Sequence, residues 1–558
     1  MTSVAPLTVA VPMAGAAGVL FLKSTRARPW LHMLTLVTVI AQIGLSVALL
    51  SDVRSGTIVY WFGGWSPRPG VVLGVSFTVD AFGAAAAVLS GVVVLAGVAV
   101  ARSTMREAGA LVDVLLLTLA AAMTGLCLSG DLFNMFVFYE LTTVAAIGLA
   151  AHDTHSRGAL RAALNLAVSN SIGAVLFLIG LALLYGRTGA LNLAEIGRRL
   201  TGLGRVDRLT IVALSLLLVG CLVKAAVVPF HFWIVDTVGS GPVPLAIILG
   251  GALGALGVFA FARIYWTVFA GPLQGEVQVV QTVLTATGAS TGIVGGALAV
   301  TFPEPRRRLA AVGVSCTGIL LVGVGCLSAR GLAGVAITAV SNGTVLAAVF
   351  IGIGLLTGEG FGRRAGRFIV GVGGLALAGL PVFGAALGDA TIACAASAAG
   401  SGWAVPAVVA AAALSAAAVL EMAWAAPSGP TLGTGTGSVG VAAILLGLAV
   451  GASTLGRSAT VGAAHFVDTV GYQGRVLDGT SLPGVVASRM VSPAFEITFG
   501  LVSVGAAAVV AAGLVRGVRP KRLGLTLRRW HASTIGDAAL WITVGTASLT
   551  VALAVGLR

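Results

Sequence analysis

Long apolar runs separated by short polar connectors repeat along the whole chain. Each run is about as long as the ~20 residues that a helix needs to cross ~30 Å of hydrocarbon. The pattern predicts sixteen transmembrane helices, at roughly 6–22, 31–51, 72–101, 109–129, 131–151, 160–186, 209–238, 242–269, 277–302, 308–329, 331–357, 366–395, 402–426, 436–456, 495–515 and 537–557. The longest hydrophilic connectors are predicted at 187–208 and 457–494.

Two of these runs contain a proline in their interior: Pro229 in the seventh and Pro381 in the twelfth. An internal proline removes a helical hydrogen bond and frees a carbonyl. Inside a membrane the exposed backbone must be covered by protein or water. We therefore predict two broken helices, which in corresponding places of two halves mark a transport pathway. Because they lie five runs apart, an odd number, the second half is predicted to be inverted relative to the first.

Composition places the chain among polytopic helical membrane proteins. Hydrophobic residues make up 58% and charged residues 9%, whereas soluble domains carry roughly 25% charged residues. The first run has no basic residue before it and is predicted to be a membrane span rather than a cleaved signal. The five cysteines all fall in apolar runs, with no metal-ligand spacing, and no phosphate loop or redox-cofactor motif is present. We therefore expect no metal and no cofactor.

The net charge of +14 does not indicate nucleic-acid binding, because the basic residues are scattered through the short connectors. Placing the N-terminus outside puts 19 basic residues in cytoplasmic connectors and 13 outside, with Lys224 in neither set. Cytoplasmic connectors are enriched in basic residues, so this count favours both termini outside. The expected location is the plasma membrane. The densest basic cluster, at 516–529, is then expected in the cytoplasm.

Lys224 stands in the middle of the seventh run, although the chain uses arginine almost everywhere else and has only two other lysines, Lys23 and Lys521. A desolvated lysine releases its proton readily, whereas arginine stays charged. Glu140 lies nine residues after Asp131, hence ~13 Å along a helix and near mid-bilayer. Glu140 and Lys224 are therefore predicted to form a pair with coupled protonation; the alternative is an ion pair that only holds two helices together.

The other ionisable residues in or near the runs are weaker candidates. Asp389 follows Pro381 in the second broken run, and His231 follows Pro229 as either a relay or a group satisfied by the freed backbone. Asp131 is predicted to be a helix cap, and Asp236 to lie at the membrane interface. Three more acids could belong to a pathway or be satisfied core groups: Asp80, Asp113 and Glu421.

Two stretches resemble signatures of a known family. GDLFNMFVFYE at 130–140 and VKAAVVPFHFW at 223–233 are similar to those of the proton-translocating, antiporter-like subunits shared by respiratory complex I and Mrp-type sodium/proton antiporters. Further matches favour the branch of the Mrp D subunits, among them YWFGGWSPRPGVVLGVSFTVD at 60–80, LLYGRTGALNLAEI at 183–196, EPRRRLAAVGVS at 304–315, AGLPVFGAALGD at 378–389 and HASTIGDAALWITVG at 531–545.

The resemblance implies an all-α core of 14 helices with two inverted five-helix repeats, spans 4–8 and 9–13. It divides the chain into an N-terminal three-span segment (1–108), a first repeat (109–270), a second repeat (271–426) and C-terminal spans (427–558). The family glutamate falls on Glu140, the broken-helix lysine on Lys224 and the ionisable residue of span 12 on Asp389.

The sequence also departs from the family pattern at its centre. The span 8 lysine aligns with Ala255, and the two histidines and the lysine of span 11 align with Ala339, Gly343 and Ala347; only Asn342 is retained there. Alanine and glycine have no side chain that relays a proton, although they leave volume that water fills if polar partners line it. With the second half isolated, Asp389→Asn is expected to be tolerated and Glu140→Gln is not.

The predicted function is a membrane subunit of a multisubunit monovalent cation/proton antiporter of the Mrp type. It would be a transporter subunit rather than an enzyme, working with other subunits, the lipid bilayer, protons and Na⁺. Two alternatives stay open: a proton-channel subunit of a complex I-like NADH dehydrogenase or membrane-bound hydrogenase, and a structural subunit that has lost transport.

Overall fold

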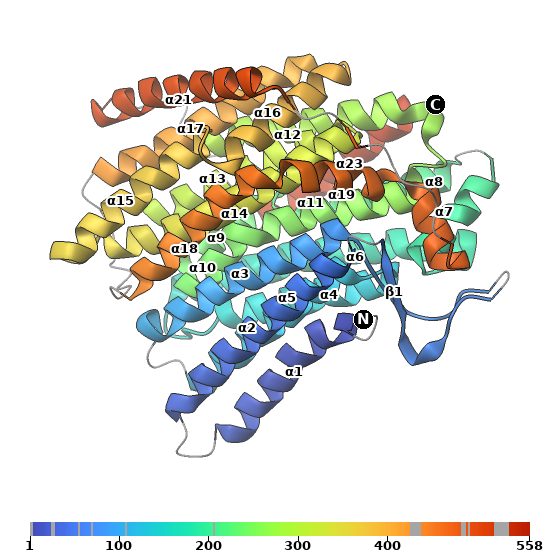
Figure 1. Cartoon of the computed structure of the whole chain (residues 1–558), viewed down its shortest axis with the longest axis horizontal. Coiled ribbons are helices and arrows are strands. Elements are labelled where there is room, and N and C mark those ends of the chain that lie inside the picture. Colours follow the sequence, from blue (N-terminus) through green and yellow to red (C-terminus); the bar gives the residue numbers. More distant parts are fainter. Residues whose placement is uncertain are drawn as a thin grey trace.

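The computed structural model describes residues 4–23, 28–53, 56–68, 71–105, 109–204, 207–424, 437–480, 487–488, 491–517 and 535–557. Long helices lie side by side in one bundle, with a small β-hairpin at one end (Figure 1). Fourteen helices of the described chain are long and apolar enough to cross a membrane. The two broken helices account for the other two of the sixteen predicted spans.

The N-terminal segment contains three helices and a hairpin. Its elements are α1 (Val4–Leu22), α2 (Arg28–Asp52), β1 (Ile58–Trp61), β2 (Ser76–Val79) and α3 (Ala81–Thr104).

The next segment runs from the fourth to the eighth span. Its elements are α4 (Gly109–Leu128), α5 (Leu132–Ala150), α6 (Arg157–Thr188), α7 (Leu193–Gly202), α8 (Arg208–Lys224), α9 (Phe232–Ser240), α10 (Val243–Ile248), the π-helical turn η3 (Leu249–Leu253), α11 (Gly254–Ile264) and the π-helical turn η4 (Tyr265–Phe269).

The remaining segments complete the bundle. Their helices are α12 (Val277–Thr301), α13 (Pro305–Gly325), α14 (Ala329–Leu355), α15 (Gly360–Leu377), α16 (Gly384–Ala398), α17 (Val405–Trp424), α18 (Ser438–Gly451), η7 (Ala452–Leu455), α19 (Gly456–Val467), α20 (Thr469–Gln473), η8 (Gly474–Asp478), α21 (Pro493–Val515) and α23 (Ile535–Gly556). Most residues of α13 and α14 are buried, whereas no more than about a third of the residues of α1, α2, α21 and α23 are.

Both predicted helix breaks are confirmed. α8 ends at Lys224 and α9 begins at Phe232, with Ala226 in the left-handed region at φ 55° between them. α15 ends at Leu377 and α16 begins at Gly384. In the first break the indole N–H of Trp233 donates to the carbonyl oxygen of Val223 at 2.9 Å. The same carbonyl also accepts from the N–H of Ala226 at 3.1 Å, so two bonds hold the last turn of α8 where the helical ladder stops.

Two predicted hydrophilic connectors contain structure that the apolar pattern did not indicate. Between 187 and 208 lies α7, whose buried Glu195 pairs with Arg198 and Arg199. The span predicted to end at 456 instead continues through η7 and α19 to Val467. The pattern failed there because Arg457 and His465 interrupt a helix that still buries Ala463 and Phe466.

The hairpin of β1 and β2 was also not predicted. Its strands pair in antiparallel register from Ile58 opposite Val79 to Trp61 opposite Ser76. Ser76 Oγ accepts a hydrogen bond of 3.1 Å from the Asn192 amide, so the hairpin is fixed to the start of α7. A side chain at Gly130 would overlap Thr78, which explains why a glycine precedes Asp131.

The termini lie toward the same side of the bundle, the side that carries β1 and α7, while α2, α15 and α18 begin on the opposite side (Figure 1). The densest predicted cytoplasmic cluster, 516–529, lies almost wholly outside the described residues. Sidedness can be tested on two exposed residues at opposite ends, Ser66 beside the hairpin and Glu359 before α15.

We expect Ser66→Cys to react with a membrane-impermeant thiol reagent added to whole cells, and Glu359→Cys to react only after permeabilisation, because basic connectors stay in the cytoplasm. Cys394, the one native cysteine that is not buried, is replaced by serine in both variants. Labelling of Glu359→Cys in intact cells would reverse the predicted orientation.

Candidate functional site

Lys224 is buried inside the bundle at the end of α8, with 2% of its surface exposed. Its Nζ donates to the carbonyl oxygen of Tyr139 at 2.9 Å and to Thr143 Oγ1 at 2.5 Å. The same atom lies 4.3 Å from the centroid of the Tyr139 ring. Because Tyr139 and Thr143 are four residues apart on α5, they present one face to the lysine. All three contacts to Lys224 therefore come from α5.

Glu140 and Lys224 lie near each other but do not form the direct ion pair that the sequence suggested. Their charges interact electrostatically, yet none of the ion pairs within 4.0 Å among the described residues joins them. Glu140 Oε1 is buried and has no hydrogen-bond partner within the described chain. The reason is geometric: Tyr139 and Thr143 face Lys224, and Glu140 follows Tyr139 by ~100° around the helix.

Tyr139 ties the two helices together next to the lysine. Its hydroxyl donates to the carbonyl oxygen of Gly220 at 2.7 Å, one turn before Lys224 on α8. Gly173 on α6 lies so close that an added side chain would press on Val223 and approach the Tyr139 hydroxyl. α6 therefore packs against the place where Tyr139 joins α5 to α8.

Asp389 lies elsewhere in the bundle, on α16 after the second break. Its side chain is buried, with 1% exposed, and its Oδ1 accepts a hydrogen bond of 3.0 Å from Thr338 Oγ1 on α14. None of the ion pairs within the described residues includes Asp389. A buried carboxyl group without a cation favours its neutral form.

Four of the weaker candidates have hydrogen-bond or ion-pair partners that explain their presence in the bundle. Asp131 caps α5 by accepting from the N–H groups of Phe133 and Asn134, as predicted. Asp80 caps α3 and pairs with buried Arg263 at 2.6 Å. Glu421 pairs with buried Arg308 at 2.7 Å, and Asp113 lies 3.5 Å from His32. These contacts favour a structural role for each of the four.

The last two candidates, Asp236 and His231, lie in the second part of the first broken helix, on α9 and at its start. Asp236 accepts from the Asn165 amide at 3.0 Å and lies 3.7 Å from Arg307. His231 is buried at the start of α9, with its ring centroid 4.4 Å from that of Phe232.

The Arg308–Glu421 pair allows a stability test. Replacing one partner leaves an uncompensated buried charge, which costs ~3–5 kcal/mol, whereas replacing both by apolar groups is often neutral. We expect Glu421→Leu to lower the thermal midpoint of the purified protein markedly and Arg308→Met combined with Glu421→Leu to recover most of the loss. A midpoint unchanged by Glu421→Leu would mean that the pair contributes little to stability.

The hydrogen-bond partners of Lys224 and Asp389 were not predicted from the sequence. Tyr139 and Thr143 flank Glu140, and their four-residue spacing was the signal that they share a face. Thr338 gave no such signal, because it precedes Asp389 by 51 residues and only the packing of α14 against α16 brings the two together.

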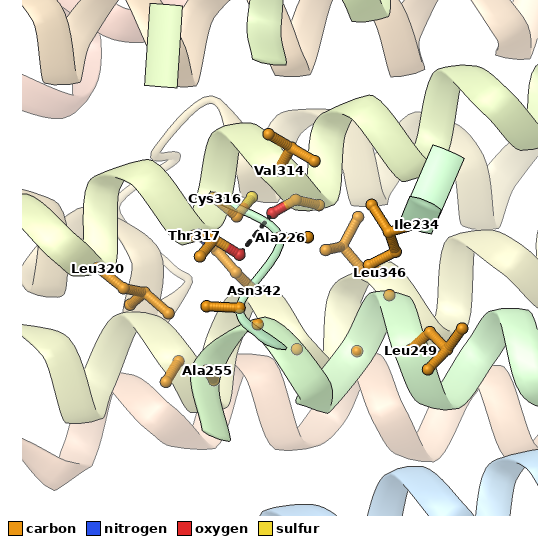
Figure 2. A pocket seen from close by; sticks show the side chains of 17 residues that line it. Ala226, Ile234, Leu249, Ala255, Val314, Cys316, Thr317, Leu320, Asn342 and Leu346 are labelled. Atoms are coloured by element: carbon orange, nitrogen blue, oxygen red, sulfur yellow. Dashed lines mark hydrogen bonds between the residues drawn. The ribbon is translucent and has the colours of Figure 1, made fainter. Parts of the chain in front are cut away.

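A cavity occupies the place where the expected relay residues are missing. Of the four positions, Ala255, Ala339 and Gly343 line it, together with the retained Asn342. Ala347 is buried one turn further along α14 and does not line it. Figure 2 shows Ala255 and Asn342 beside the loop that carries Ala226.

These features define a polytopic helical membrane protein with ionisable groups buried inside its bundle, an arrangement typical of ion and proton pathways. A family model described as NADH:quinone oxidoreductase/Mrp antiporter, TM, matches residues 129–415, just over half of the chain. The chain belongs to this family, as the resemblance in sequence implied.

Known relatives come from both branches of the family. The chain is 28% identical to the N subunit of the NADH-quinone oxidoreductase of Desulforudis audaxviator over 353 residues, 61% of this chain and 68% of the relative. It is 32% identical to the D subunit of a probable K⁺/H⁺ antiporter of Rhizobium meliloti over 322 residues, 57% of each chain. The matched part thus covers little more than half of the second relative.

Solved structures show the same fold. A chain of the Mrp complex from Dietzia sp. DQ12-45-1b aligns with a TM-score of 0.68 at 24% identity, covering 99% of this chain and 100% of that one. A chain of an archaeal membrane-bound sulfane sulfur reductase aligns with a TM-score of 0.75 at 24% identity, covering 85% of this chain and 100% of that one.

Proposed function

We propose that this protein is a membrane subunit of a multisubunit monovalent cation/proton antiporter of the Mrp type, in which Lys224 carries the proton. The single observation that carries the proposal is the buried ammonium at the end of a broken helix, held by Tyr139 and Thr143. Similarity to the antiporter protein of Rhizobium meliloti supports the Mrp branch.

The contacts of Lys224 suit a group that changes its protonation state. An amine and an ammonium both donate to a carbonyl and a hydroxyl oxygen, so the bonds to Tyr139 and Thr143 persist in both states. Only the charged form gains from the Tyr139 ring and from the nearby Glu140 carboxylate. Deprotonation therefore changes the electrostatic balance without first requiring a new position for the lysine.

We propose that Glu140 controls the protonation of Lys224 by changing the position of its side chain. The carbonyl that accepts from Lys224 belongs to Tyr139, one peptide bond before Glu140, and Glu140 Oε1 has no hydrogen-bond partner within the described chain. Rotation of the Glu140 side chain toward Lys224 would stabilise the ammonium, and rotation away would favour proton release. Cation movement in the complex would be coupled to this rotation.

The order of helices supports two inverted repeats, spans 4–8 (α4 to η4) and spans 9–13 (α12 to α17). In each set the fourth span is the broken one, α8 with α9 and α15 with α16. We propose that both repeats belong to the transport unit, with other subunits of the complex supplying the cation path.

A second candidate function is a proton-channel subunit of a complex I-like assembly, which the similarity to the oxidoreductase protein of Desulforudis audaxviator favours. The experiment is reconstitution of the complex, co-expressed with the products of neighbouring genes, into proteoliposomes with an internal pH dye. Acidification or alkalinisation driven by a Na⁺ or K⁺ gradient alone supports the antiporter. Proton movement that requires NADH and quinone supports the second function, and none under either condition supports a structural subunit.

A further inference from the structure

The last two helices of the described chain each lie against one of the two helix breaks. α21 packs against α17 and against α16, which begins after the second break, whereas α23 packs against α6 and against α8, which ends at the first break (Figure 1). On their other sides both helices face outward, where α21 exposes Leu501 and Val509 and α23 exposes Leu540 and Val551. α21 and α23 therefore lie between the breaks and the surroundings of the bundle.

The two breaks have the same backbone structure. After each helix end the same series of N–H groups donates to carbonyl oxygens of the preceding turn, in the same order and at the same spacing. The donors are Ala225, Ala226, Val227 and Phe230 in the first break and Ala378, Gly379, Leu380 and Phe383 in the second. The second residue of each series has a positive φ, 55° at Ala226 and 84° at Gly379. The breaks are therefore equivalent, and each has backbone groups that must be covered by protein or water rather than by lipid.

At the first break the close approach of α23 depends on Gly545, in the middle of that helix. A Cβ added to Gly545 would lie 2.7 Å from Cγ of Pro229 and 2.7 Å from Cε1 of Phe230. Carbon atoms attract one another at about 3.5–4.0 Å, so both contacts would be strongly repulsive. Pro229 is a rigid ring and Phe230 is buried, so neither moves aside easily. Glycine is therefore the residue that lets the α23 backbone lie on the break.

The contact extends along one face of α23. Trp541 lies one turn before Gly545, and its ring centroid is 6.1 Å from that of Phe232, the first residue of α9. Ala538 packs against the same phenylalanine. Because these three residues of α23 are three and four positions apart, they share a face of the helix. α23 thus follows the chain through the break from Pro229 to Phe232.

At the second break Gly500 of α21 has the corresponding place. A Cβ added to Gly500 would overlap the carbonyl oxygen of Gly379 and lie 3.5 Å from Cγ of Pro381. Gly500 belongs to the buried face of α21, which also includes Ser503 and Ala507 at helical spacing. The α21 backbone therefore lies directly on the backbone of the break, as small residues allow at helix contacts in membranes.

We propose that α21 and α23 are equivalent supports that hold the two broken helices in position, with Gly500 and Gly545 as the positioning residues. α23 holds the break next to Lys224, and α21 holds the break that precedes Asp389. The inference rests on the proposed function in taking Lys224 as the proton carrier.

The position of the first break matters because Lys224 is the last residue of α8 and precedes Pro229 by a short segment. A side chain on α23 that displaced Pro229 would shift this segment and with it the lysine. The distances from Lys224 to Tyr139 and Thr143 on α5 would then change. The same shift would alter the electrostatic interaction with Glu140, on which the protonation of Lys224 depends.

The first test measures each break independently of transport. Amide hydrogen exchange of the purified full chain, followed by mass spectrometry, reports local opening of the backbone. We expect Gly545→Ala to accelerate exchange at 225–232 roughly tenfold and to leave 378–384 unchanged, and Gly500→Ala to have the reverse effect. The matched control is Gly505→Ala, also on α21, because a Cβ there meets no atom within 4 Å. It should leave exchange at both breaks unchanged.

The second test determines whether the contact at Gly545 positions Lys224. Cation-driven proton flux of the reconstituted complex is measured as a function of pH for the wild type, Gly545→Ala and Gly505→Ala. We expect the pH of half-maximal flux to move by about half a unit or more in Gly545→Ala only, because a small change in the interaction with Glu140 is sufficient for such a shift. A variant that only assembles less well loses flux equally at every pH, and its midpoint does not move.

Three results would overturn the inference: unchanged exchange at both breaks in Gly545→Ala and Gly500→Ala, equal acceleration in Gly505→Ala, or acceleration spread over the whole chain, which would indicate a general loss of stability. Faster exchange at 225–232 with an unmoved pH midpoint would show that α23 holds the break without positioning Lys224. If the wild-type complex moves no protons, the proposed function fails, while exchange at the two breaks still decides whether α21 and α23 support them.

Discussion

Lys224→Ala is expected to reduce cation-driven proton flux by ~100-fold or to background, the scale at which removal of a positioned proton-transfer group acts. Lys224→Arg is expected to be as severe. Arginine keeps its charge in any environment, and its larger head must fit where Nζ now lies between Tyr139 and Thr143. Flux is measured in proteoliposomes with an internal pH dye.

Lys23→Ala is the matched control, because Lys23 is exposed just after α1 and should support normal flux. Assembly of the complex must be the same for all variants. Normal flux in Lys224→Arg would rule out a lysine that releases its proton, and Lys224 would then be only a structural cation.

Asp389→Asn is expected to reduce proton flux by a similar factor, ~100-fold. The sequence alone led to the opposite expectation, because the missing side chains at Ala255 and Gly343 separated Asp389 from the first repeat. The Asp389 carboxyl group is buried in the second broken helix against Thr338, where it can accept and release a proton, and an asparagine cannot. Asp389→Glu retains the carboxyl group and should keep a measurable fraction of the flux.

Glu140→Gln is expected to be equally severe, because the amide loses the negative charge that stabilises the ammonium of Lys224. Full activity in Asp389→Asn would show that proton transport does not need Asp389, as the sequence suggested.

Sequence patterns were sufficient for the features that depend on local chemistry. Apolar run length located the spans, and the prolines at 229 and 381 located both breaks, because an internal proline removes a helical N–H donor and crowds the preceding turn. Asp131, directly before α5, was predicted as a helix cap because a short side chain at a helix start accepts from the N–H groups of the first turn.

Features that depend on packing between distant segments could not be predicted. The buried partners of Asp80 and Glu421, Arg263 and Arg308, are separated from them by more than a hundred residues. Glu140 and Lys224 were expected to pair, but the ~100° step between consecutive helical residues gave the direct contact to the backbone of Tyr139. The alanines and glycine at the relay positions indicated only a loss, because the cavity between them depends on how four separate segments pack.

The bonds around the last turn of α8 have a consequence for the speed of the pathway. The Tyr139 hydroxyl donates to the carbonyl of Gly220, and the indole N–H of Trp233 donates to the carbonyl of Val223. The backbone that carries Lys224 is therefore hydrogen-bonded from two sides. A lysine on such a backbone can change its position only by turning its own side-chain bonds, whereas hinge motions of whole segments take microseconds to milliseconds. Turnover on that slower scale would then be timed by rearrangement elsewhere, such as in a neighbouring subunit, and not by a hinge motion of the segment that carries Lys224.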